Sequence, residues 1–461
     1  MSAIHYSIKE INKYLPPTNH WLILASSVPV ALSCGTVFAF SIYSTQLSEQ
    51  CNLTTSNTSS LNISMVIGSA LGGLIGGLVT DVFGTQLPML LGCVTMFFGY
   101  KWLYELFNQG EDASLMFLII SMFFVGIGST AGYFSAIKAV TIEFPNFKAT
   151  AQSITIACFA ISSLIISFIA THVFQSDIAA FLKFLYITCG SLNFIGFLFI
   201  RVEGHYKPGG EVFIEDNENE AMALLPSHSH PKTKNLSHLD LKESIMHPIF
   251  WYHFFMFSII QGLGQMYIYQ VGFIIKAVYN YYPGGNLHHL QALHVSLIAV
   301  CSFIGRLSSG PTSDFLVKSG FQRHWGLVLG LTIMLMGHLF NILSLDIFGS
   351  LHVANIFLSI NSCLIGFAYG FSFTCYPAII SDIFNMKNYS FIWGLMYSST
   401  AFGLTLMSRL FGFFYDLHSE FDGDDLVCFK GSGCYFQTFE ITSSLCFLVI
   451  CFILGYIYYR K

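Results

Sequence analysis

Charged residues are scarce in this chain: Asp, Glu, Lys and Arg together make up 10% of its 461 residues. Soluble domains carry roughly 25% charged residues, because a surface that faces water needs them. Hydrophobic residues reach 54%, and the mean hydropathy is +0.62. We therefore expect an integral, multi-pass membrane protein whose surface mostly contacts the lipid bilayer.

Other features are absent too. The net charge of −5 is small and does not favour a nucleic-acid partner. The first twenty residues are polar and contain Pro16 and Pro17, which is unlike a secretory signal peptide, so the first apolar run is expected to remain as a span. We find no Cys/His spacing typical of a zinc site and no catalytic constellation. The sequence therefore predicts no metal, no cofactor and no enzyme.

Long apolar runs dominate what is present. Lipid offers no partner to a backbone amide, so only helices or closed barrels can cross it. These runs do not alternate apolar with polar residues as barrel strands do. We predict helical spans at 21–44, 60–80, 86–107, 114–139, 149–173, 179–200, 248–277, 291–312, 324–345, 353–380, 390–415 and 438–459. The expected fold is an all-α membrane protein whose twelve transmembrane helices form two pseudo-symmetric six-helix bundles.

The domain boundaries follow from this pattern. Residues 1–20 form an N-terminal segment, 21–200 the first bundle, 201–247 a polar linker and 248–461 the second bundle. The linker composition predicts disorder. Within it, Glu220, Leu224 and Leu225 form an acidic dileucine pattern. Such patterns are read by adaptor complexes that sort cargo to vacuolar or lysosomal membranes, although they also occur by chance, which leaves the plasma membrane open.

Most Lys and Arg residues outside the spans fall on the side of the N-terminus, which predicts that both termini and the linker are cytosolic. The sequons at Asn52, Asn57 and Asn62 crowd the first loop and agree with an external location of that loop. Cys428 and Cys434 lie in a polar loop between the last two spans. A disulfide between them is expected if that loop faces an oxidising compartment.

The two halves repeat each other. Gly77 and Asp81 end the second span as a Gly-x-x-x-Asp motif, and Gly310 and Asp314 end the eighth span in the same way. Internal duplication is typical of transporters that alternate around a site at the middle of the membrane. Gly allows a close helix approach, and Asp can cap a helix N-terminus or attract a cation. A contact of this kind, broken and remade during transport, would act as a gate, although a plain helix cap remains an alternative.

The two-bundle layout and the Gly77-x-x-x-Asp81-x-x-Gly84 loop resemble the major facilitator superfamily. Longer strings resemble its nodulin-like branch, especially the fungal members: residues 35–44 (GTVFAFSIYS), 136–146 (AIKAVTIEFPN) and 262–269 (GLGQMYIY), and Gly305-Arg306 before Ser313-Asp314. That branch is similar to the monocarboxylate and oxalate/formate transporter groups, which implies small organic anions as substrates. The family loop usually has basic residues after Gly84, whereas this chain has Thr85-Gln86-Leu87-Pro88. A cation partner for Asp81 must therefore come from elsewhere.

Arg306 is the strongest candidate substrate ligand. It precedes Asp314 by eight residues, or ~12 Å of helix, which places it well inside the bilayer. A planar guanidinium suits a carboxylate, and the resemblance implies that the arginine at this place contacts the substrate anion. The alternative is an internal ion pair. The eleventh span has no cation over residues 393–402, which favours a monocarboxylate or a zwitterion over a dianion.

Further polar side chains at or near the middle of spans complete the candidate binding set. Lys138 either reaches the membrane interface or lines the cytosolic vestibule. The others could equally be helix–helix hydrogen bonds or interface anchors. These others are Tyr43, Tyr133, Gln265, Tyr269 and Tyr376.

We therefore expect a monomeric secondary transporter of a small organic anion, with a coupled proton as an option. No Asp or Glu lies at the centre of a span, so no carboxylate relay for that proton is evident. Neutral amino acids or other small metabolites remain open as substrates. A transporter-like receptor or scaffold that moves nothing is the alternative from a different class.

Overall fold

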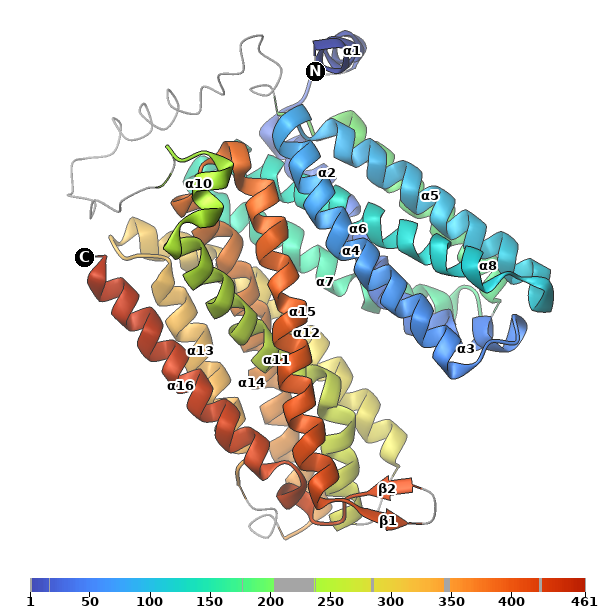
Figure 1. The fold of residues 1–461 in the computed structure, drawn as a ribbon, viewed down its shortest axis with the longest axis vertical. Helices are drawn as coiled ribbons and strands as arrows, with labels where there is room; N and C mark the ends of the chain where they lie inside the picture. Colours follow the sequence, from blue (N-terminus) through green and yellow to red (C-terminus); the bar gives the residue numbers. More distant parts are fainter. Residues whose placement is uncertain are drawn as a thin grey trace. The chain divides into compact units, whose positions relative to one another are not determined.

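The computed structural model describes residues 2–15, 17–175, 177–202, 236, 238–282, 286–343, 349–422 and 425–460. These residues divide into two compact units (Figure 1). The first unit draws on 1–230, 234–245 and 380–397, and the second on 246–379 and 398–461. The segment Ile380–Tyr397 therefore packs with the first unit although it lies late in the sequence. The predicted boundaries of the two bundles stay a prediction.

The first unit is helical. It contains α1 (Ser2–Tyr14), α2 (His20–Cys34), η1 (Gly35–Ala39), α3 (Phe40–Gln50), α4 (Thr55–Phe83), α5 (Gln86–Gln109), η2 (Gly110–Asp112), α6 (Leu115–Glu143), η3 (Pro145–Phe147), α7 (Lys148–His172), α8 (Ile178–Phe199) and α10 (Leu241–Met246). The first predicted span consists of three consecutive segments, α2, η1 and α3. Side-chain caps start several helices: Asn19 accepts a hydrogen bond from Leu22 N at 2.8 Å, and Asp177 does so from Ala180 N at 2.9 Å.

The second unit begins with α11 (Pro248–Tyr281), α12 (Leu287–Lys318), α13 (His324–Phe340) and most of α14 (Leu351–Ile383). The junction that follows, with η6 (Met386–Asn388) and the start of α15 (Tyr389–His418), belongs to the first unit. The rest of α15, the hairpin of β1 (Glu420–Asp422) and β2 (Asp425–Val427), η7 (Gly431–Cys434) and α16 (Phe436–Tyr459) complete the second unit. Each of the twelve predicted spans coincides with helix in the described chain.

Close helix packing repeats in the two units, and glycines permit it. In the first unit α4 lies along α6 (Figure 1), and a Cβ on Gly72 would meet Ile127 O at 2.4 Å. In the second unit α12 packs on α14, where a Cβ on Gly305 would meet Phe367 O at 2.2 Å and one on Gly370 would meet Ser302 O at 2.1 Å. Both pairs join the second and fourth spans of their half. Packing of small residues is the usual way for helices to associate in lipid, and its recurrence supports the predicted duplication.

Candidate functional site

Arg306 lies inside the second unit, on α12, with 6% of its surface exposed. Its guanidinium carbon is 4.5 Å from the ring centroid of Phe373 and 5.5 Å from that of Tyr369, both on α14. Nε and Nη1 are buried and have no hydrogen-bond partner among the described residues. Aromatic faces attract a cation, but they do not replace its hydrogen bonds. Arg306 is therefore a buried cation with unused donors.

Gln265 of α11 reaches the same place. Its Nε2 donates to the hydroxyl of Tyr369 at 3.2 Å, and its Oε1 is buried without a partner in the described chain. Helices α11, α12 and α14 thus bring Gln265, Tyr369 and Arg306 together. We call these three residues with Phe373 the Arg306 site. It offers a positive charge, a free amide oxygen and two aromatic walls.

The other two binding candidates of the second unit, Tyr376 and Tyr269, differ in their burial. Tyr376 is fully buried, its ring centroid lies 4.5 Å from that of Phe257, and Phe257 also contacts Phe373 at 5.9 Å. Its hydroxyl has no partner among the described residues. Tyr376 therefore adjoins the Arg306 site through Phe257. Tyr269 is 62% exposed, but its phenol is close enough to that of Tyr369 to interact with it electrostatically.

Tyr43 and Tyr133 belong to the first unit, and both are completely buried. The ring of Tyr133 stacks on Phe159, with centroids 4.0 Å apart and planes at 9°. Tyr43 contacts Phe40 and Phe181 edge-on or tilted. Aromatic packing accounts for the position of each ring within the first unit.

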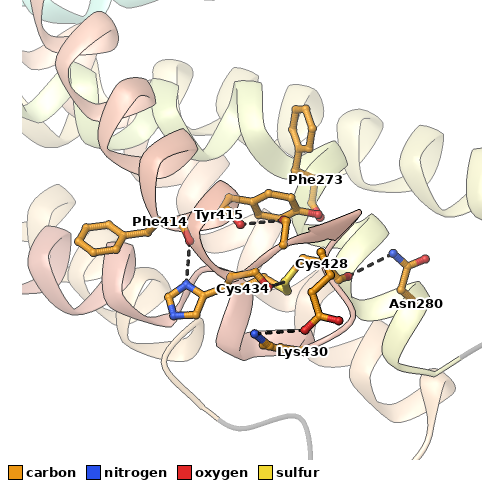
Figure 2. The surroundings of a disulfide bond; sticks show 10 residues. Phe273, Asn280, Phe414, Tyr415, Cys428, Lys430 and Cys434 are labelled. Carbon is orange, nitrogen blue, oxygen red and sulfur yellow. Dashed lines mark hydrogen bonds and ion pairs between the residues drawn. A yellow bond between two sulfur atoms is a disulfide. The ribbon is translucent and has the colours of Figure 1, made fainter. Parts of the chain in front are cut away.

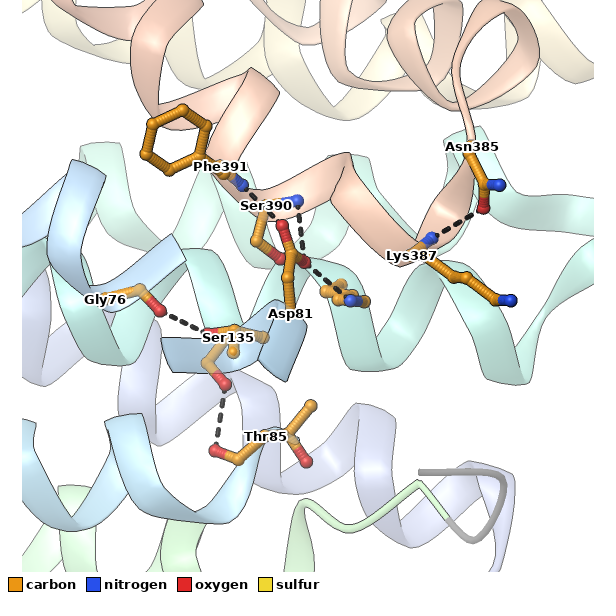
Figure 3. A network of polar contacts seen from close by, with 10 residues as sticks. Gly76, Asp81, Thr85, Ser135, Asn385, Lys387, Ser390 and Phe391 are labelled. Carbon is orange, nitrogen blue, oxygen red and sulfur yellow. Dashed lines mark hydrogen bonds and ion pairs between the residues drawn. The ribbon is translucent and has the colours of Figure 1, made fainter. Parts of the chain in front are cut away.

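Asp81 lies at the end of α4 and joins two parts of the chain that are far apart in sequence (Figure 3). Its Oδ1 is 2.6 Å from Nζ of Lys138, and side-chain exposure is 5% for Asp81 and 1% for Lys138. It also accepts hydrogen bonds from the backbone N–H groups of Ser390 at 3.1 Å and Phe391 at 2.8 Å. These donors lie in the first turn of α15, where the helix dipole favours a negative charge.

Lys138 provides the cation from outside the loop that the sequence predicts for Asp81. A place of Lys138 at the interface or in the vestibule stays a prediction. Gly77 permits the approach, because a Cβ there would lie 2.5 Å from Ser390 O. Gly84 ends α4 at φ 87°, a conformation that favours glycine. We call Asp81, Lys138 and the first turn of α15 the Asp81 clamp.

Further contacts surround this clamp. Lys148, at the start of α7, forms an ion pair with Asp382, and Gln152 Nε2 donates to the hydroxyl of Tyr389 at 3.2 Å. These residues were not predicted as functional. Their only signal was polarity near the ends of apolar runs, which does not identify a partner.

The second motif has a different cation. Asp314 Oδ1 is 2.8 Å from Nη1 of Arg323, which also donates to Ser313 Oγ at 2.9 Å. Arg323 precedes α13 and has 6% of its surface exposed. Gly310 lies on α12 one turn before Asp314. The sequence analysis does not single out Arg323, although its spacing of nine residues from Asp314 is a signal for this pair.

Cys428 and Cys434 are bonded to each other in the loop before α16 (Figure 2). The carbonyl of Cys428 accepts from Asn280 Nδ2 at 3.2 Å, which ties the loop to the end of α11. Lys430 and Glu420 add an exposed pair at 3.6 Å. Burial raises the pKa of the neighbouring Tyr435 phenol, so its hydroxyl stays protonated.

The remaining predicted sites are the glycosylation sequons and the sorting pattern. Asn52 lies outside the helices at φ 50°, whereas Asn57 and Asn62 lie within α4. The sorting pattern of Glu220, Leu224 and Leu225, and most of the predicted linker, lie outside the described residues.

The sequence is similar to a family model and to membrane proteins of fungi. The family model described as Nodulin-like matches residues 20–227. An uncharacterized membrane protein of Saccharomyces cerevisiae is 28% identical over 98% of both chains. The probable transporter MCH1 of Wickerhamomyces anomalus is 27% identical over 89% of this chain and 81% of its own.

Solved structures show the same architecture. The fucose:proton symporter FucP of E. coli superposes with a TM-score of 0.60 at 15% identity, covering 96% of this chain and 99% of its own. The major facilitator proton:xylose symporter XylE gives 0.65 at 14% identity, covering 95% and 96%. The protein thus has the major facilitator fold, which confirms the predicted fold class. Over residues 20–227 the chain is similar to the nodulin-like family.

Proposed function

We propose that this protein is a secondary transporter of a small organic anion, a monocarboxylate, which binds at Arg306 and crosses the membrane by alternating access. The carrying observation is the buried guanidinium with unused donors. Lys138 and Arg323 are also buried, but Asp81 and Asp314 neutralise them. A carboxylate ligand would give Arg306 the anion that the described chain does not supply.

The chemistry of the site fits one carboxylate. The guanidinium can donate two parallel hydrogen bonds to it, while the rings of Tyr369 and Phe373 would cover an apolar tail. The orphan Gln265 Oε1 can accept a hydrogen bond from a substrate hydroxyl or from a protonated acid. A second carboxylate would need another cation near Arg306, and Arg323, which lies in the same unit, is already paired with Asp314.

The relatives support transport as the class of function. One is named a probable transporter, and two structural neighbours are named proton symporters. We propose the Asp81 clamp as a gate in this cycle. In the present conformation it holds the first turn of α15, and its ion pair and two backbone hydrogen bonds would have to break for that turn to move.

The test is uptake of radiolabelled L-lactate into liposomes containing the purified protein. Arg306→Gln should lower the initial rate by at least about tenfold, because a charge-assisted hydrogen bond contributes about 1.5–3 kcal/mol. Arg306→Lys should retain part of the activity. Arg409→Gln is the matched control, since Arg409 is an exposed arginine of α15. Wild-type rates in well-folded Arg306→Gln would refute the assignment of the substrate to Arg306.

A further inference from the structure

A second buried titratable group lies on α12, toward its start. His294 is completely buried, and both ring nitrogens have partners on α14. Nδ1 is 2.9 Å from Ser362 Oγ, and Nε2 is 2.9 Å from Asn355 Oδ1. The Arg306 site does not include this histidine, and none of the sequence motifs predicted it.

The contacts continue into α11. The hydroxyl of Tyr267 is 2.9 Å from Ser362 Oγ and accepts from Asn361 Nδ2 at 3.4 Å. An amide nitrogen only donates, so Tyr267 can direct its own hydrogen to Ser362. Ser362 then donates to Nδ1 of His294, whose Nε2–H donates to Asn355. In this hydrogen-bonded network each group donates to the next one, from Tyr267 through Ser362 and His294 to Asn355. Both nitrogens of a neutral imidazole therefore have a suitable partner.

One more proton can be held with one small rearrangement. It binds to the lone pair of Nδ1, which then donates to Ser362 Oγ. That oxygen has two lone pairs and can accept from both Tyr267 and His294. The Ser362 hydroxyl hydrogen turns to the helix carbonyl one turn earlier, a common bond for serine in helices. Asn355 is only half buried, so the hydrogen-bonded network comes near the protein surface at the start of α14.

Among the described residues, the titratable groups near this hydrogen-bonded network include Tyr267 on α11 and Cys363 on α14. They also include Cys301 on α12, which interacts with Cys363, and Tyr435 before α16, which interacts with Tyr267. No Asp, Glu, Lys or Arg is hydrogen bonded or ion paired to His294 within the described residues. A bound proton would therefore be the only charge of this chain of groups.

The same three helices build both sites. Helix α11 supplies Tyr267 here and Gln265 to the Arg306 site, and α14 supplies Ser362 here and Tyr369 there. Helix α12 carries both His294 and Arg306, ~18 Å apart along its axis. The two sites thus share α11, α12 and α14, so a movement of one of these helices against the others would alter both. We propose that His294 is a proton-binding site and that its proton is the one coupled to transport through the Arg306 site.

The first test needs no substrate. In lipid nanodiscs, protein with isotope-labelled imidazoles is titrated by NMR between about pH 4 and pH 8, the range in which histidine charge changes. We expect one titrating signal that is lost in His294→Gln and kept in His338→Gln. His338 is the matched control, a fully buried histidine of α13 hydrogen bonded to Thr442 at 2.9 Å. Ser362→Ala should lower the midpoint by about one pH unit, a tenfold loss of proton affinity. A His294 signal that does not move overturns the proposal.

The second test asks about coupling and rests on the proposed function. An inward proton gradient should concentrate L-lactate in wild-type liposomes by up to about tenfold per pH unit. In His294→Gln this accumulation should disappear while exchange of labelled for unlabelled lactate continues, because exchange needs no net proton movement. Unchanged accumulation overturns the coupling role. If wild-type protein moves no lactate, the proposed substrate fails, and the NMR titration still decides whether His294 binds a proton.

Discussion

The Asp81 clamp allows a quantitative test by a double-mutant cycle of Asp81→Asn and Lys138→Met. Removing one partner of a buried pair costs about 3–5 kcal/mol of stability, because the remaining charge is buried alone. Asp81→Asn strands a completely buried ammonium and should lie at the upper end of this range. Lys138→Met leaves a carboxylate that still accepts from Ser390 N and Phe391 N, so it should lie near the lower end. The double variant strands no charge and should lose far less than the sum.

The measurement is the free energy of unfolding of purified protein in detergent micelles, taken from denaturant titrations. We expect a coupling free energy of about 2–4 kcal/mol between the two positions. The control cycle uses Lys101→Met and Glu105→Gln, a pair at 3.7 Å with 41% and 50% side-chain exposure. An exposed helix pair of this kind should give only about 0.3–0.5 kcal/mol. Additive losses at Asp81 and Lys138 would refute the burial argument.

Three further outcomes follow from the described contacts. Arg323→Gln should destabilise the protein by about 3 kcal/mol in the same titrations, because it removes the arginine that pairs with the buried carboxylate of Asp314, and an unchanged value would contradict the pairing. Replacing Cys428 and Cys434 by Ser should cost about 2 kcal/mol, the loop entropy of a short ring; a variant as stable as wild type under oxidising conditions would count against the bond. Asn52 should carry glycan, since it lies outside the helices, and Asn52→Gln should abolish a mass shift on glycosidase treatment if the first loop is external.

The helices could be predicted from sequence because lipid permits so few backbone conformations. The apolar runs located all twelve, and several helices extend past the predicted ends by a turn or more, as α12 does to Lys318 and α6 does to Glu143. The burial of Arg306 was also predictable, since its distance from Asp314 along one helix depends on the fixed rise per residue. Its neighbours Tyr369 and Phe373 were not, because they depend on how α14 packs against α12.

Long-range pairing explains the other omissions. Asp81 meets Lys138, 57 positions away, and backbone donors more than 300 positions away. A sequence pattern shows that each group needs a partner but not which one it finds. His294 left no signal at all, because its partners Ser362 and Asn355 are small polar residues of a type that occurs throughout these helices.

The membership of Ile380–Tyr397 in the first unit has a consequence for dividing the protein. A chain cut within 203–235 would separate the two halves that the sequence suggests. The N-terminal fragment would keep the Lys138–Asp81 ion pair but would lose the hydrogen bonds from Ser390 N and Phe391 N. It would also lose the backbone of Ser390 that packs against Gly77. Such a fragment would be an incomplete folding unit. Function should return only when the C-terminal fragment is co-expressed and supplies that segment in trans.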